Sequence, residues 1–154
     1  MHFRRQSLSP WIDLLPVVMS VIASIVDLRR REIPDTIWIV ILVMVPIRIW
    51  FLWPAVSPWH LVIGAIAALL LGCLVGRGDR FGGGDVKLFA ALGAWFGIAA
   101  VVPLALWAAV AGLPLAIIAA WRGQTDFAYG PAIAIGVLTH WLSPNLLGQL
   151  GGWA

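Results

Sequence analysis

Long apolar stretches without charged residues alternate with short polar segments along almost the whole chain. A helix of about 20 apolar residues crosses the hydrocarbon core of a bilayer and bonds its own backbone groups where no water is present. Each stretch therefore predicts a transmembrane helix. The six predicted spans cover residues 11–26, 36–53, 59–75, 86 to about 97, about 103 to 121, and 129 to about 147. The stretch 86–121 is too long for one span, and the segment from Gly97 to Pro103 is the predicted turn within it.

The amino-acid composition supports this interpretation. Of the 154 residues, 62% are hydrophobic and 11% are charged, whereas soluble proteins carry roughly 25% charged residues. An ordinary soluble protein is therefore excluded. The predicted fold class is all-α, with residues 1–154 forming a single polytopic integral membrane domain and no separate soluble domain. The single cysteine, Cys73, excludes an internal disulfide framework and a cysteine-cluster metal site.

The basic residues predict the orientation of the chain in the bilayer. Seven of the ten fall in or beside the three loops predicted on one side, which are residues 27–35, 76–85 and 122–128: Arg29, Arg30, Arg31, Arg77, Arg80, Lys87 and Arg122. Basic residues accumulate in cytoplasmic loops, so these loops are predicted to face the cytoplasm from the inner membrane. Arg4 and Arg5 argue for the opposite orientation. The net charge of +3 is too small and too scattered to indicate a nucleic-acid partner.

Two acidic residues stand at the predicted cytoplasmic boundary of the membrane. Asp27 continues the helical run of the first apolar stretch on its last turn, and Asp85 directly precedes the fourth stretch. Two carboxylates at one depth on different helices are able to approach each other. The alternative interpretation is that Asp85 only caps a helix while Asp27 pairs with Arg30 or Arg31.

The remaining polar residues have simpler interpretations. Asp35 is predicted to cap the second helix, Asp13 to be hydrated, and Arg48 to extend its long side chain to the membrane interface. Three further acidic residues stand beside arginines in loops and are predicted to be solvated: Glu32, Asp79 and Asp126. The histidines lack metal-ligand spacing and are predicted to be interface residues, so no metal site is expected: His2, His60 and His140.

Three consecutive glycines, at positions 82–84, precede Asp85. Glycine adopts left-handed backbone conformations and allows another chain to approach closely. The segment is therefore predicted to admit an extended peptide beside Asp85. The residues alone leave three classes open: an enzyme, a small proton- or cation-coupled transporter subunit that uses Asp27 and Asp85 as ion sites, and a structural scaffold whose glycines mediate helix packing.

At these residues the sequence resembles the type IV prepilin peptidases, which are membrane aspartic proteases with a G-x-G-D motif. The segments that carry the resemblance are 82–88 (GGGDVKL), 27–35 (DLRRREIPD) and 129–136 (YGPAIAIG). The resemblance implies that Asp27 and Asp85 are the catalytic pair, with Gly82, Gly84 and Lys87 in the supporting loop. It also implies that the substrate is a prepilin or pseudopilin whose leader is cleaved at the cytoplasmic boundary.

The chain departs from the long bacterial members of that family, because it has no paired Cys-x-x-Cys motifs. It is more similar to the short, peptidase-only form associated with Flp/Tad pili and to archaeal preflagellin peptidases, so methylation is not implied. The expected mechanism uses no cofactor. Two close carboxylates share one proton, which activates a water molecule for attack, and partial burial is expected to raise both pKa values. No oligomeric state and no assignment of acid and base are predicted.

Overall fold

The computed structural model of the chain describes residues 9–52, 57–75, 82–123 and 128–142. These residues form helices and no strands, which confirms the predicted all-α class. The helices are α2 (Ser9–Ile12), α3 (Leu14–Arg30), α4 (Asp35–Leu52), α5 (Pro58–Val75), α6 (Gly83–Phe96), α7 (Ile98–Trp121) and α8 (Gly130–Leu142). The predicted end of the last span near residue 147 lies outside the described residues, as do His2, Arg4, Arg5, Arg77, Asp79, Arg80 and Asp126.

Two of the described helices, α5 and α7, are long and apolar enough to cross a membrane, and α8 is a shorter apolar helix. Both long helices carry large apolar side chains on their outer faces. Leu70, Val110 and Leu113 are each 63% exposed. Exposed aliphatic surface on this scale is unfavourable in water and suits contact with lipid. Six spans remain a prediction.

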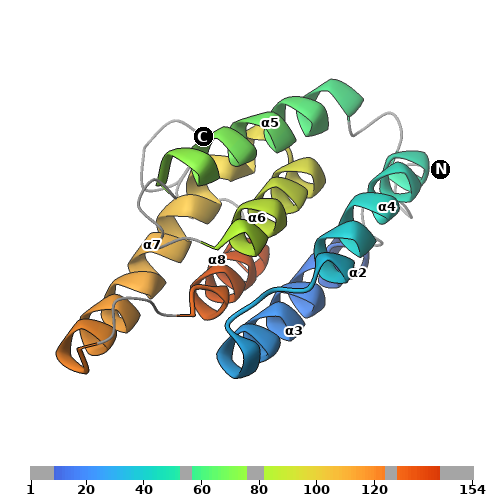
Figure 1. Cartoon of the computed structure of the whole chain (residues 1–154). Coiled ribbons are helices and arrows are strands. Elements are labelled where there is room, and N and C mark those ends of the chain that lie inside the picture. Colours follow the sequence, from blue (N-terminus) through green and yellow to red (C-terminus); the bar gives the residue numbers. More distant parts are fainter. Residues whose placement is uncertain (1–8, 53–56, 76–81, 124–127, 143–154) are drawn as a thin grey trace.

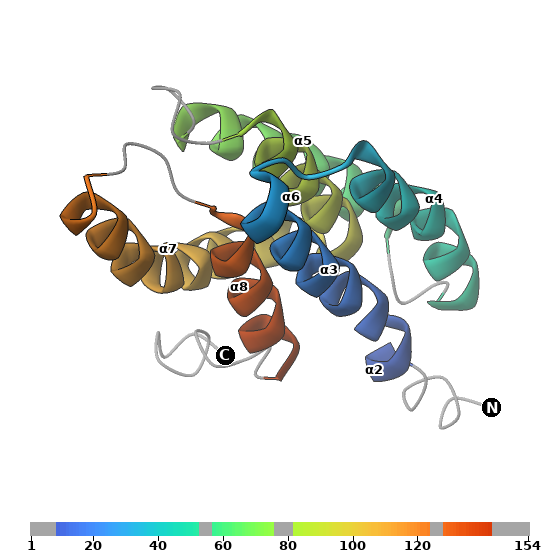
Figure 2. The same cartoon turned by 60° about the horizontal axis from the view of Figure 1, so that its bottom comes forward.

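Helix α6 lies at the centre of the bundle, between α5 and α4, with α3 and α8 on its other side (Figure 1). Its residues Leu88, Leu92 and Trp95 are almost completely buried. Helix α3 lies between α8 and α4, as the second view shows (Figure 2). The first turn of this helix packs against the α3–α4 connection, where Gly84 lies close to Ile33.

Glycines set the closest helix contact and the sharpest turn. A Cβ atom added to Gly64 of α5 would clash with the Gly93 carbonyl oxygen of α6, so glycine at both positions lets the two backbones touch. Gly97 has φ +84°, a left-handed value that glycine adopts readily, and it separates α6 from α7. The turn predicted between Gly97 and Pro103 is thus confirmed at its first residue, and Pro103 lies inside α7.

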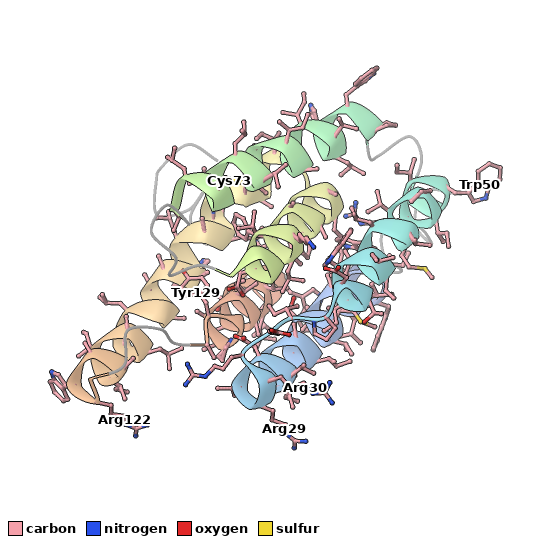
Figure 3. The ribbon with its side chains drawn as sticks, viewed as in Figure 1. Arg29, Arg30, Trp50, Cys73, Arg122 and Tyr129 are labelled. Atoms are coloured by element: carbon pink, nitrogen blue, oxygen red, sulfur yellow. The ribbon has the colours of Figure 1, made fainter. Side chains whose placement is uncertain are left out.

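Helix α3 ends one turn after Asp27. Arg31 has φ 57°, and its backbone N–H donates to the Asp27 carbonyl at 2.8 Å. The predicted loop at residues 27–35 is therefore shorter than expected, since α3 continues to Arg30 and α4 begins at Asp35. Figure 3 shows Arg29, Arg30 and Arg122 toward one edge of the molecule and Trp50 of α4 at the opposite edge.

A polar cluster lies at the other end of α3. Its contacts show that the predictions for Asp13 and Arg48 were wrong. Asp13 accepts hydrogen bonds from Arg48 Nε at 3.1 Å and from Trp95 Nε1 at 2.8 Å. The Arg48 guanidinium also lies 5.5 Å from the centre of the Trp95 ring. Asp13 is therefore bonded to protein groups, and Arg48 is buried rather than extended to the interface. The reason is that α3, α4 and α6 bring a carboxylate, a cation and an indole N–H to one point.

Candidate functional site: a cavity with two aspartates

A cavity of about 270 Å³ opens where the end of α3, the connection to α4 and the first turn of α6 meet. Its lining consists of Asp27, Arg31, Glu32, Ile33, Asp35, Gly82, Gly83, Gly84, Asp85 and Lys87. The structure thus brings Asp27 and Asp85 together at one cavity, along with the predicted supporting residues. The side chains of Asp27 and Asp85 are almost fully buried, at 5% and 7% exposure.

The first turn of α6 positions Asp85. Gly82 is the residue before the helix, and its backbone N–H donates to Asp85 Oδ2 at 3.1 Å. This bond is one half of a capping box, which confirms that Asp85 caps the helix. Asp85 Oδ1, however, is buried and has no hydrogen-bond partner among the described residues. Capping therefore accounts for only one of the two carboxyl oxygens.

The last turn of α3 positions Asp27, and the first residue of α8 completes its environment. The Gly130 N–H donates to Asp27 Oδ2 at 2.8 Å. An added Cβ at Gly130 would lie 2.9 Å from the same oxygen, so only glycine allows this approach. The sequence indicated a Gly-Pro segment here but not that its amide reaches Asp27, 103 residues away. A helix N-terminus favours a negative charge, which helps to keep Asp27 ionised.

The surroundings of the two carboxyl groups shift their pKa values by different amounts. The first apolar stretch ends at Val26 and the fourth begins at Val86, so both carboxyl groups lie just outside these stretches. Burial, reinforced by the charge of Asp27, raises the pKa of Asp85 to about 7. Burial also raises the pKa of Asp27, but the Gly130 hydrogen bond and the charge of Arg31 oppose that rise. Near neutral pH this arrangement favours a proton on Asp85 and a negative charge on Asp27.

Asp35 and Lys87 face each other across the rim of the cavity. Lys87 Nζ donates to Asp35 Oδ1 at 2.9 Å, and Trp38 Nε1 donates to the same oxygen at 2.7 Å. Lys87 Nζ also lies 5.6 Å from the centre of the Trp38 ring. These two hydrogen bonds lower the pKa of Asp35. Asp35 thus links the start of α4 to α6 through side chains, and its predicted role as a helix cap stays a prediction.

The glycines at 82–84 do not adopt the left-handed conformation that their sequence suggested. None of them has a positive φ, and Gly83 and Gly84 belong to α6 rather than to a loop. A Cβ on Gly84 would lie 3.0 Å from Ile33 Cβ and 3.1 Å from its carbonyl oxygen, so Gly84 lets α6 pack against the α3–α4 connection. A Cβ on Gly83 would meet nothing within 4 Å. Open space therefore lies beside Gly83, and the close contact at Gly84 is internal.

The described residues contain no group of three or more His, Cys, Asp or Glu side chains that could hold a metal ion. The chemistry that the cavity offers is that of two carboxyl groups with raised pKa values, each oriented by a backbone amide. Such a pair is able to activate a water molecule and to protonate a carbonyl oxygen.

Comparison with known proteins gives the class of this chain. The model of the type IV leader peptidase family matches residues 14–117, and the chain belongs to this family. The match includes both Asp27 and Asp85. It confirms the resemblance to the type IV prepilin peptidases drawn from the sequence motifs.

Several curated relatives carry related names. The chain is 36% identical over 125 residues to a prepilin leader peptidase/N-methyltransferase of Burkholderia pseudomallei, covering 73% of this chain and 40% of the relative. It is 33% identical over 129 residues to a type 4 prepilin-like proteins leader peptide-processing enzyme of Escherichia coli O78:H11, covering 74% and 45%. A prepilin leader peptidase/N-methyltransferase of Pectobacterium carotovorum is 32% identical over 140 residues, covering 82% and 49%. The chain thus spans less than half the length of these relatives, and no solved structure matches it.

Proposed function

We propose that this chain is a membrane aspartic endopeptidase that removes the N-terminal leader of a prepilin or pseudopilin. The observation that carries the proposal is that Asp27 and Asp85, from two different helices, line one cavity. The charge of Asp27 also raises the pKa of Asp85, so the two carboxyl groups interact. The substrate class is inferred from the family and from the names of the relatives.

The hydrogen bonds of Asp27 and Asp85 indicate which carboxyl oxygen of each donates or accepts a proton. Asp85 Oδ2 accepts a bond from Gly82, so the proton of Asp85 belongs on Oδ1. Asp27 Oδ2 accepts a bond from Gly130, which leaves Asp27 Oδ1 to take a proton from a water molecule. The water oxygen attacks the scissile carbonyl carbon while Asp85 protonates the carbonyl oxygen. When the C–N bond breaks, the proton held by Asp27 passes to the leaving amine, and the hydroxyl proton of the intermediate returns to Asp85.

The proposed setting is the cytoplasmic boundary of the inner membrane. Arg29, Arg30 and Arg31 directly follow Asp27, and Arg122 follows α7, so basic residues gather at the end of the bundle that holds the cavity. In this arrangement the six predicted spans stay in lipid and the cavity opens to water. A substrate with a membrane helix and a water-exposed leader is then able to present its cleavage site at the aspartates.

The proposal is tested with the full chain reconstituted in lipid vesicles together with candidate prepilins. Leader removal is measured by gel shift and by mass spectrometry of the new N-terminus. We expect Asp27→Asn and Asp85→Asn each to reduce the cleavage rate by at least about 1,000-fold, because an amide does not transfer the proton.

Asp13→Asn is the matched control, since it makes the same chemical change at the opposite end of α3. It is expected to cleave within about threefold of the parent rate per folded molecule. Cleavage at the parent rate by either Asp27→Asn or Asp85→Asn would exclude the catalytic pair.

A further inference from the structure

The first turn of α6 brings to the cavity two backbone N–H groups that have no acceptor among the described residues. The N–H groups of Asp85 and Val86 donate to the Gly82 carbonyl at 3.0 and 3.3 Å. The N–H groups of Gly83 and Gly84 donate no hydrogen bond within the described part of the chain, as is usual for the first residues of a helix. Both glycines line the cavity.

A second observation at the same place points to a bound group. Asp85 is 7% exposed, and its Oδ1 atom has no partner among the described residues. Leaving a buried polar atom without a partner costs about 1–3 kcal/mol, so such an atom usually faces a ligand or water. A protonated Oδ1 and a free amide N–H are both donors. Together they suit an oxygen that accepts two hydrogen bonds, such as the carbonyl oxygen of a peptide.

The surroundings distinguish the two amides. Gly84 packs against Ile33, with its added Cβ only 3.0 Å from Ile33 Cβ, so the α3–α4 connection occupies that side. Gly83 is exposed, and nothing lies within 4 Å of the position of its Cβ. An extended peptide is therefore able to reach the Gly83 amide next to Asp85.

We propose that the backbone N–H of Gly83 binds the scissile carbonyl oxygen of the substrate and polarises the carbonyl group as Asp85 protonates that oxygen. The oxygen thus lies between the Gly83 amide and Asp85 Oδ1. This inference rests on the proposed peptidase function and adds a second electrostatic group to it. Donors of this kind at a helix N-terminus are already oriented before reaction, and removing one typically lowers kcat by about 100- to 1,000-fold.

The position of Gly83 allows its N–H to be removed selectively. Gly83 is the first residue of α6, where proline is well accepted because this N–H is not used by the helix. Gly82 before it has φ −63° and ψ 147°, a conformation that a following proline permits. Gly83→Pro and Gly83→Ala both add a Cβ, but only the proline removes the donor.

The test compares these two variants of the full chain in vesicles with a prepilin substrate. We expect kcat of Gly83→Pro to be about 100-fold below that of Gly83→Ala, with KM values within about threefold and the same pH profile. Equal kcat values in two variants that melt at the same temperature would overturn the inference. A shifted pH profile would also overturn it, because the amide would then act on Asp85 rather than on the substrate.

A second measurement does not depend on the proline variant folding. The amide protons of glycine-labelled Asp27→Asn protein are followed by NMR as uncleaved prepilin is added, with the Gly83 signal assigned from Gly83→Ala. A downfield shift of the Gly83 proton is expected, and no change at a saturating substrate concentration would contradict the inference. If Asp27→Asn or Asp85→Asn cleaves normally, the peptidase proposal itself fails. If both are inactive while Gly83→Pro equals Gly83→Ala, only the role of Gly83 fails.

Discussion

Helix α3 carries a carboxylate near each end, and the protein surrounds the two in different ways. Asp13 accepts hydrogen bonds from the charged Arg48 and from the Trp95 indole, at 3.1 and 2.8 Å. Asp27 accepts a bond from the backbone amide of Gly130 and shares its cavity with a second carboxyl group, Asp85. One acid is thus joined to a cation, whereas the other stands beside another acid.

Under the proposed function, the partners of each acid, rather than its burial alone, distinguish a structural acid from a catalytic one. The Arg48–Asp13 pair has side-chain exposures of only 10% and 20%, yet its charges compensate each other and tie α3, α4 and α6 together. The backbone bonds at Asp27 and Asp85 orient each carboxyl group through one oxygen only. The proposal assigns the other oxygen of each group to water and substrate.

Among variants that keep both aspartates, the largest effect is expected from Gly130→Ala. The added Cβ would lie 2.9 Å from Asp27 Oδ2 and 3.0 Å from Asp27 Cβ, so α8 or Asp27 must move. A displacement of about 1 Å at a catalytic group lowers activity by about 100-fold. Leader cleavage per folded molecule is the measurement.

Gly136→Ala is the control for packing of the same helix. Its Cβ would lie 3.0 Å from the Leu104 carbonyl oxygen and the Ala108 nitrogen, far along α8 from the aspartates. Equal losses of cleavage in the two variants would mean that the Gly130 contact has no special role at Asp27.

Removing the acid at the opposite end tests stability instead of chemistry. Asp13→Ala leaves the buried Arg48 cation and the Trp95 N–H without their acceptor, which is expected to cost about 2–4 kcal/mol of unfolding free energy. Thermal melting in detergent measures the loss, and Asp13→Asn should melt between Asp13→Ala and the parent. An undiminished melting temperature in Asp13→Ala would show that the cluster does not hold the three helices.

The pH dependence of cleavage sharpens the assignment of the two aspartates. Asp85 has to be protonated, and burial raises its pKa to about 7, so it loses its proton as pH rises through that value. Cleavage should therefore fall about tenfold per pH unit well above pH 7. On the acid side, activity should fall as Asp27 gains a proton. This fall should occur above the ordinary pKa of an aspartate, because burial raises the pKa of Asp27. A rate that keeps rising from pH 7 to 9 would contradict the acid role of Asp85.

The smallest effect is expected at the rim of the cavity. The Asp35–Lys87 pair is solvent-exposed, with side-chain exposures of 58% and 49%, and water screens such pairs strongly. Asp35→Asn and Lys87→Met should each change the cleavage rate by less than about fivefold. A complete loss of cleavage in Asp35→Asn with an intact fold would place Asp35 in the reaction itself.

Much of the helix pattern was predictable because long apolar stretches without charged residues mark most of the helices. The limits of α4 and α5 agree closely with the predicted spans, and the helix break at Gly97 lies at the start of the predicted turn. Asp27 and Asp85 could be placed at one boundary because each adjoins an apolar stretch whose ends must reach water. That common depth allowed the two to meet, and the packing of the helices brings both to one cavity.

Contacts between distant segments were not predictable from hydropathy. The Gly130 amide lies 103 residues from Asp27 in sequence, and only the packing of α8 against α3 brings the two together. Arg48 was predicted to extend to the interface, since no sequence pattern indicated that Asp13 and Trp95 would contact it. The contact of Gly84 with Ile33 was equally unpredictable, because it depends on the path of the α3–α4 connection.

The central claim is that Asp27 and Asp85 act as one interacting pair, and an infrared titration of the protonated carboxyl group of Asp85 tests it most directly. The band is identified by its loss in Asp85→Asn, and it is titrated in the parent protein and in Asp27→Asn. Burial and the charge of Asp27 together raise the pKa of Asp85 to about 7, so removing that charge should lower the titration midpoint. The same midpoint in both proteins would contradict the account, because the two carboxyl groups would then be too far apart to share a substrate and a water molecule.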